Sequence, residues 1–252
     1  MAVLNTLDTH APKNEWFRDF FNKENFLESN TLSQKQIYYF KRFLKFADVL
    51  DSKTRTRLAY LGKEIGWDTP AYLGLLLVNL AANNQQFRWY IKSMVMDHEY
   101  ELSEIVDKLI NEGGQSQDNA KRIISAFTRF SENVFGTELH WCAVYKEGKD
   151  SFYTRTKCVV TDYRVFLYGL YKFAELNDDL KHFTLDTLMD EGADRKGLSP
   201  TQIFGIDAEE AELILKGLSA RYEDFINASF THDLQKIDLR EDKTSADVLS
   251  LF

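Results

Sequence analysis

The chain has 252 residues, of which 44% are hydrophobic and 28% charged, and this composition excludes disorder over most of its length. No apolar run approaches the roughly 18 to 20 residues that a membrane-spanning helix needs. The first residues lack the basic start and apolar stretch of a signal peptide, so we expect a cytoplasmic protein without membrane contact.

Charge is distributed unevenly along the chain. The net charge is −8, and residues 163–252 carry all of it, whereas residues 1–162 are neutral. Within the neutral part, residues 35–66 form a basic stretch with a net charge of +5. This stretch could face an anion such as a nucleic-acid backbone, and the acidic C-terminal part could not.

Residues 1–68 are predicted to form a helical region. Aromatic residues at helical spacing within residues 16–21 indicate a short helix. Ser33, followed three residues later by Gln36, matches a capping box at the start of an amphipathic helix. A further helix is expected over residues 55–65. The outer face of the amphipathic helix carries the cations Lys41, Arg42 and Lys45.

Residues 69–160 follow the order of elements in a winged helix, which belongs to the helix-turn-helix group. Thr69 and Pro70 predict the start of a buried apolar helix, and residues 86–93 are expected to form a short strand. Apolar spacing then predicts a helix over residues 102–110, and Ser116 caps a second one. Residues 139–145 and 151–159 flank a turn and indicate a β-hairpin, the wing.

Residues 161–252 repeat this plan. Helices are expected over residues 163–176, 183–189 and 208–222, and the last of them begins after the N-cap Asp207. Two strands and a closing helix follow. The predicted fold is therefore mainly α, of the α+β class, with tandem winged-helix-like modules at 69–160 and 161–252 behind the N-terminal helical region at 1–68.

The strongest binding signal is the position of cationic residues in the first module. In a winged helix, the second helix of the turn faces a DNA groove and the wing contacts the backbone. Basic side chains there could displace counterions from phosphate, and the basic face at residues 41–45 is a second candidate surface. The candidate nucleic-acid-binding residues are Lys121, Arg122, Ser125 and Arg129 on the helix, and Lys146, Lys149, Arg155 and Lys157 on the wing. Acidic neighbours dilute this charge, and many winged helices bind only proteins.

Motifs for catalysis are missing from the sequence. It holds no glycine-rich phosphate loop, no nucleophile elbow and no HExxH zinc motif. We therefore expect no metal, no cofactor and no enzymatic activity of the chain itself, and an unrecognised active site would involve Asp186, His182 and His232. Cys142 and Cys158 are expected to be free thiols that face each other across the hairpin.

Several segments have a recognisable sequence. They are residues 16–18 (WFR) with 26–27 (FL), 65–68 (IGWD), 77–81 (LVNLA), 170–175 (LYKFAE), 199–205 (SPTQIFG) and 225–234 (FINASFTHDL). Together they resemble the C-terminal region of phosphoadenosine phosphosulfate reductase-family proteins, in the large forms found in bacterial DNA phosphorothioation and phage-defence gene clusters. The resemblance implies an accessory part, because the family's chemistry rests on an SGGxDS-type loop and often a cysteine cluster, and this chain has neither.

The sequence thus predicts a non-catalytic nucleic-acid-binding accessory module of a bacterial DNA-modification or phage-defence complex, with DNA and a partner protein subunit as its partners. The alternative is a protein-interaction scaffold, in which the acidic second module docks a basic partner. A homodimer is a further possibility under this alternative, with the aromatic-rich helix at residues 163–173 as its seam.

Overall fold

The computed structural model describes residues 4–192, 195–231 and 234–252. The N-terminal part contains α1 (Asn14–Asn22), α2 (Gln34–Phe46), β1 (Leu50–Asp51), β2 (Thr54–Arg55) and α3 (Arg57–Glu64). The middle part contains α4 (Pro70–Asn83), α5 (Gln85–Ser93), β3 (Tyr100–Glu101), α6 (Leu102–Asn111), α7 (Gln117–Ser131), α8 (Val134–Thr137), β4 (Cys142–Glu147) and β5 (Asp150–Arg155). The C-terminal part contains α9 (Tyr163–Leu176), β6 (His182–Thr184), α10 (Leu185–Met189), α11 (Pro200–Phe204), α12 (Ala208–Arg221), β7 (Ile226–Thr231), β8 (Leu234–Leu239), α13 (Ser245–Val248) and a final 3-10 turn (Leu249–Leu251).

The structure confirms the predicted α+β class, which is mainly helical. The middle and C-terminal parts each build a three-stranded antiparallel sheet, in the orders β3-β5-β4 and β6-β8-β7. The central strand is β5 in the first sheet and β8 in the second, which in each case is the last strand along the chain. Both parts also have the same order of elements, namely helix, strand, helices and hairpin. The winged-helix assignment and the boundaries of the modules stay predictions.

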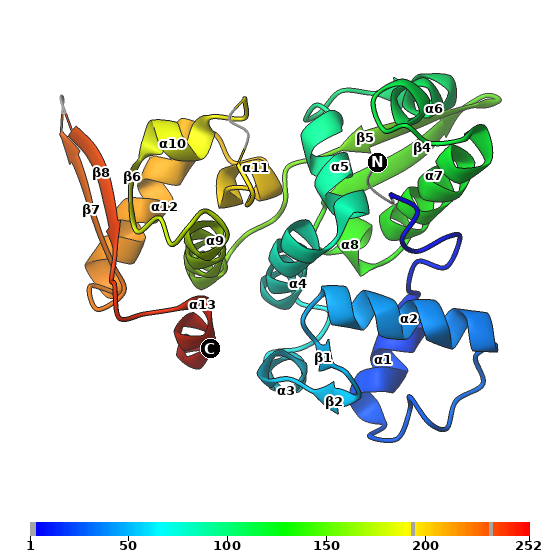
Figure 1. Ribbon diagram of the computed structural model, residues 1–252, viewed down its shortest axis with the longest axis horizontal. Coiled ribbons are helices and arrows are strands. Elements are labelled where there is room, and N and C mark those ends of the chain that lie inside the picture. The colour runs from blue at the N-terminus through cyan, green and yellow to red at the C-terminus, as the bar shows by residue number, and fades with distance from the viewer. Residues whose placement is uncertain (1–3, 193–194, 232–233) are drawn as a thin grey trace.

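Helix α4 belongs to the middle part and packs against both the N-terminal and the C-terminal part (Figure 1). It is buried from Tyr72 to Ala81 and contacts α2, α5, α9 and α11. Gly74 permits a close approach to α9, because a Cβ atom there would lie 2.7 Å from Cγ1 of Val165. The buried Asn79 side chain donates to the carbonyl of Ala47 (3.2 Å) and accepts from the hydroxyl of Tyr168 (2.8 Å). One apolar core therefore runs through all three parts.

Residues 86–93 were predicted as a strand, and this prediction was wrong, because they belong to helix α5. Asn84 caps that helix by accepting hydrogen bonds from the N–H groups of Gln86 (2.9 Å) and Phe87 (3.4 Å). Phe87, Tyr90 and Ile91 are then buried on one helical face.

The prediction that Cys142 and Cys158 face each other across the hairpin was also wrong, because Cys142 pairs with Arg155. Both cysteines are free thiols, as predicted, and both are buried.

Across the described residues, each helix is too short or too polar to cross a membrane.

Candidate nucleic-acid interface

The N-terminal segment, residues 4–13, covers part of the α7 face that was predicted to bind DNA. Near the start of the helix, Nδ2 of Asn5 donates to Oδ1 of Asn119 (3.2 Å). Beyond its end, Nδ2 of Asn133 donates to the carbonyl of Pro12 (2.8 Å). Leu7 anchors the segment in the core, because its side chain is fully buried. It is therefore a packed part of the fold that runs along α7 (Figure 1).

Asp8 neutralises Arg122, one of the predicted cations of that face. Its buried carboxylate accepts from Nη1 of Arg122 (2.8 Å) and forms a second ion pair with Nζ of Lys35 on α2 (2.7 Å). Burial raises the pKa of Asp8, but the hydrogen bonds from Lys35 and Arg122 lower it more, so the pKa lies below its ordinary value. Arg122 thus holds the N-terminal segment in place.

The other predicted residues of α7 are dispersed. Lys121 is exposed and has no ion pair among the described residues, and Ser125 is half-buried. Arg129 lines a hollow of about 380 Å³ together with Lys13, Glu15 and Glu132. Because two carboxylates share that hollow with two cations, this end of the helix is not a strongly positive surface.

The wing residues also differ in their surroundings. Lys146 and Lys149 are exposed at the hairpin tip and alternate with Glu147 and Asp150. Lys157, beyond the end of β5, forms an ion pair with Glu210 of α12. Among the residues that the structure describes, the wing thus supplies two cations without an ion pair, in a stretch of balanced charge.

Arg155 is a structural residue, and its prediction as a nucleic-acid contact was wrong. It is only 4% exposed, because β5 directs it toward the ends of α5 and α11. Its guanidinium donates to the carbonyls of Ile91 (2.7 Å) and Gln202. It therefore ties the first hairpin to the C-terminal part and cannot reach a ligand on the surface.

The predicted cations of α2 lie together on one open face. The capping box of Ser33 and Gln36 is present and begins the helix, and Phe40, Phe43 and Leu44 are buried. The opposite stripe therefore points outward and borders a hollow of about 520 Å³. We call this the α2 hollow, and its lining residues are Leu27, Glu28, Tyr38, Lys41, Arg42, Lys45, Leu50, Ser52 and Lys53.

The α2 hollow has an excess of positive charge. Four cations line it against the single carboxylate of Glu28. Among the residues that the structure describes, Lys41, Lys45 and Lys53 have no ion pair, and Arg42 packs over the ring of Phe46 with 5.5 Å between Cζ and the ring centroid. Three of these cations lie on α2, and the fourth, Lys53, belongs to the same basic stretch of residues 35–66; the tight turn between β1 and β2 brings it to the hollow.

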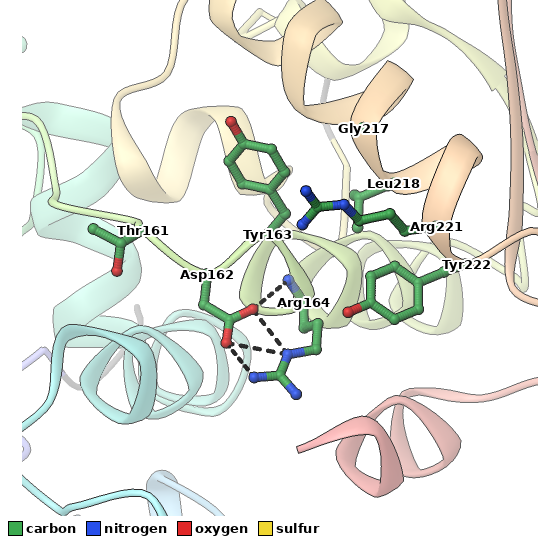
Figure 2. A pocket seen from close by; sticks show the side chains of 8 residues that line it. All are labelled: Thr161, Asp162, Tyr163, Arg164, Gly217, Leu218, Arg221 and Tyr222. Carbon is green, nitrogen blue, oxygen red and sulfur yellow. Dashed lines mark hydrogen bonds and ion pairs between the residues drawn. The ribbon is translucent and has the colours of Figure 1, made fainter.

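A larger hollow of about 630 Å³ lies where α9 begins, and Figure 2 shows its lining. The Arg164 guanidinium is directed at the carboxylate of Asp162, with Nη2 to Oδ2 at 2.5 Å, and it also packs on Phe252. Arg221 is the remaining cation in this hollow, beside Tyr163 and Tyr222 (Figure 2). One of its two cations is thus neutralised, so this hollow is a weaker binding site for an anion than the α2 hollow.

The second module presents an acidic surface on α12. Glu209, Glu212 and Leu213 border a hollow of about 500 Å³, and Leu213 is 62% exposed. By contrast, the aromatic residues of α9, the predicted homodimer seam, are mostly buried within the chain, including Phe166, Tyr168 and Phe173. Most aromatic side chains of this helix thus pack within the chain itself, and a homodimer stays a prediction.

The predicted location for a catalytic site shows ordinary polar pairing. The exposed ring of His182 lies within hydrogen-bond distance of Asp238 (2.7 Å) and Glu241 (3.0 Å). Asp186 is exposed on α10, and His232 lies outside the described residues. Within the described ranges, no group of three or more His, Cys, Asp or Glu residues is placed to hold a metal ion. Burial raises the pKa of the Cys158 thiol to about 12, which makes it a poor nucleophile.

The chain is an α+β protein with two three-stranded sheets of the same strand order, and its fold is shared by solved structures. A magnesium ion-bound SspB crystal structure matches with a TM-score of 0.72 at 13% identity, over 100% of this chain and 88% of that chain. A second SspB crystal structure matches with a TM-score of 0.68, with the same identity and coverage. At this identity the likeness shows the fold. No family model and no curated protein matches, so the comparisons give no support to the phosphoadenosine phosphosulfate reductase family itself.

Proposed function

We propose that this chain is a non-catalytic accessory protein of a bacterial DNA-modification or phage-defence complex, and that it binds nucleic acid through the α2 hollow. Its fold is shared with the SspB crystal structures. The sequence resemblance to proteins of DNA phosphorothioation and phage-defence gene clusters supports this setting. In this proposal any catalysis belongs to a partner subunit.

The observation that carries the proposal is the charge of the α2 hollow. Lys41, Arg42, Lys45 and Lys53 converge there, and none of the four has a carboxylate partner among the described residues, although Arg42 packs over the ring of Phe46. A cation that is not already paired can replace the counterions of a phosphate group, and their release favours binding. The cations that Asp8 and Glu210 hold in ion pairs would first have to break those pairs.

Salt dependence tests this proposal. We expect a labelled DNA oligonucleotide to bind in an anisotropy titration, and its affinity to fall by about 100-fold between about 50 and 200 mM salt if all four cations contact phosphates. Binding that does not depend on salt, or no binding at low salt, would contradict the proposal.

A protein-interaction scaffold is the second candidate, and the exposed Leu213 favours it. This side chain lies between carboxylates on α12 and would suit a basic partner with an apolar anchor. Light scattering after size exclusion, with and without a candidate partner subunit, separates the two functions. A scaffold forms the complex and ignores DNA, and Leu213→Asp would weaken that complex.

A further inference from the structure

We infer that the α2 hollow accepts one unstacked nucleotide, and that the chain therefore prefers single-stranded DNA to duplex DNA. This inference rests on the proposed function and adds to it the form of the nucleic acid. It combines three properties of the hollow, namely its shape, an exposed aromatic ring and the position of its cations.

The shape of the hollow suits a small unit. It is walled by one stripe of α2, by the turn between β1 and β2, and by the loop after α1. Its volume of about 520 Å³ falls within the range of about 300 to 1,000 Å³ that is typical of small-ligand sites. A duplex presents stacked, paired bases inside two backbones, so it could contact the rim cations but could not enter.

Tyr38 supplies a surface for a base. Its side chain is 57% exposed, although it is a large aromatic residue. The ring packs edge-on against Tyr39, with 5.1 Å between centroids, and Tyr39 in turn lies 5.3 Å from the ring of His10. These contacts hold Tyr38 from one side and leave much of the ring open to the solvent. Stacking of a base on an aromatic side chain is the main contact by which proteins bind single strands without reading their sequence.

The cations stand where the phosphates of that nucleotide would lie. Lys41 and Lys45 follow Tyr38 at three and seven residues along the same helical stripe, and Lys53 lies across the hollow on the β1–β2 turn. Leu27 and Leu50 contribute apolar surface to the lining. The aromatic ring and the apolar side chains would contact a base, and the unpaired cations beside them would contact its flanking phosphates. Free phosphate would contact the cations but neither the ring nor the leucines.

The test compares one DNA sequence as a single strand and as a duplex, at low salt, with four forms of the protein. These are the wild type, Tyr38→Ala, Tyr38→Phe and, as a matched control, Tyr60→Ala, which removes a tyrosine that is 49% exposed outside the hollow. We expect the wild type to bind the single strand about 5-fold more tightly or better. Tyr38→Ala should abolish this preference, while Tyr38→Phe and Tyr60→Ala should keep it.

A change in the ligand gives a second readout, whose first comparison uses the wild type alone. A single strand with abasic sites keeps the phosphates and removes the bases, so the wild type should bind it about 5-fold less tightly than the intact strand, and Tyr38→Ala should not distinguish the two. If salt-dependent binding persists but the duplex binds as well as the single strand, or if Tyr38→Ala keeps the preference, this inference is wrong and the proposed function stands. If neither form of DNA binds, both are wrong.

Discussion

Helices α2 and α7 are alike in sequence and differ in what surrounds their cations. Each begins at a serine N-cap, buries one apolar stripe and carries basic residues on its other face. On α7, the N-terminal segment lies beside the basic face and Asp8 pairs with Arg122. On α2, the outer stripe borders an open hollow, and within the described part of the chain Lys35, near the start of the helix, is its one cation with an ion pair, to Asp8.

This difference shows that a cation's use depends on the segments packed beside it. The analogy with a winged helix singled out α7 because its position in the order of elements is that of a DNA-reading helix. The structure keeps that order but gives part of the surface to residues 4–13. Within one chain, some cations therefore stabilise the fold and others remain free for a ligand.

The largest effect on stability is expected for Arg155→Ala. This change removes charge-assisted hydrogen bonds to buried carbonyls that join the first hairpin to α5 and α11. The free energy of unfolding should fall by about 3 kcal/mol or more, and chemical denaturation measures it. Lys149→Ala, at the exposed tip of the same hairpin, is the control. Equal stability of the two variants would show that Arg155 is not structural.

A smaller loss is expected for Asp8→Asn. The substitution keeps the size of the side chain and its tolerance of the left-handed backbone (φ 52°), but it removes the charge that holds Lys35 and Arg122. Because both partners are partly solvated, the free energy of unfolding should fall by only about 1 to 2 kcal/mol. Asp107→Asn, on the exposed side of α6, should be neutral.

The same variant has a consequence for DNA binding. Asp8→Asn frees Arg122, so a large gain in DNA affinity would show that α7 is an interface that Asp8 blocks. Our account expects the affinity to change little, since the α2 hollow stays intact.

The stabilisation by Asp8 should depend on pH in one direction. Its pKa is lowered below the ordinary value of 3.8 in the folded state, so the folded protein binds fewer protons at this group than the unfolded chain. The stabilisation is therefore complete near neutral pH and is lost as the pH falls below about 4. Denaturation at a series of pH values should show the wild type and Asp8→Asn converging at acid pH. A difference that grows on acidification would reverse the sign of our assignment.

The smallest effect is expected for Lys121→Ala. This side chain is exposed and has no ion pair among the described residues, so the free energy of unfolding should change by less than about 0.5 kcal/mol. DNA affinity should also stay near that of the wild type. A clear loss of affinity would show that α7 contacts DNA and would contradict our account.

Local chemistry in the sequence was sufficient to predict many helices. The capping box at Ser33, the N-caps Thr69, Ser116 and Asp207, and the stripes of apolar residues give helices close to the observed ones. Residues 86–93 misled the prediction because aromatic and β-branched residues favour strands, although Asn84 was an available signal for a helix start.

The candidate site was less predictable, because it depends on contacts between distant residues. The cationic stripe of α2 follows from helical spacing alone, and the structure shows it bordering the α2 hollow. That Asp8 would meet Arg122, 114 residues later, depends on how the N-terminal segment packs. The burial of Arg155 likewise depends on α11, an element that the sequence analysis did not expect. No local pattern separates such a buried arginine from an exposed one.

A paired charge reversal discriminates between α2 and α7 as the DNA-binding surface. One variant carries Lys41→Glu, Arg42→Glu and Lys45→Glu in the α2 hollow, and its match carries Lys121→Glu, Lys146→Glu and Lys149→Glu, three exposed cations of α7 and the wing. Circular dichroism confirms that both fold, and anisotropy measures their affinity for single-stranded DNA at low salt. Our account predicts that the first variant loses binding and the second retains most of it. Loss in the second with retention in the first would contradict it.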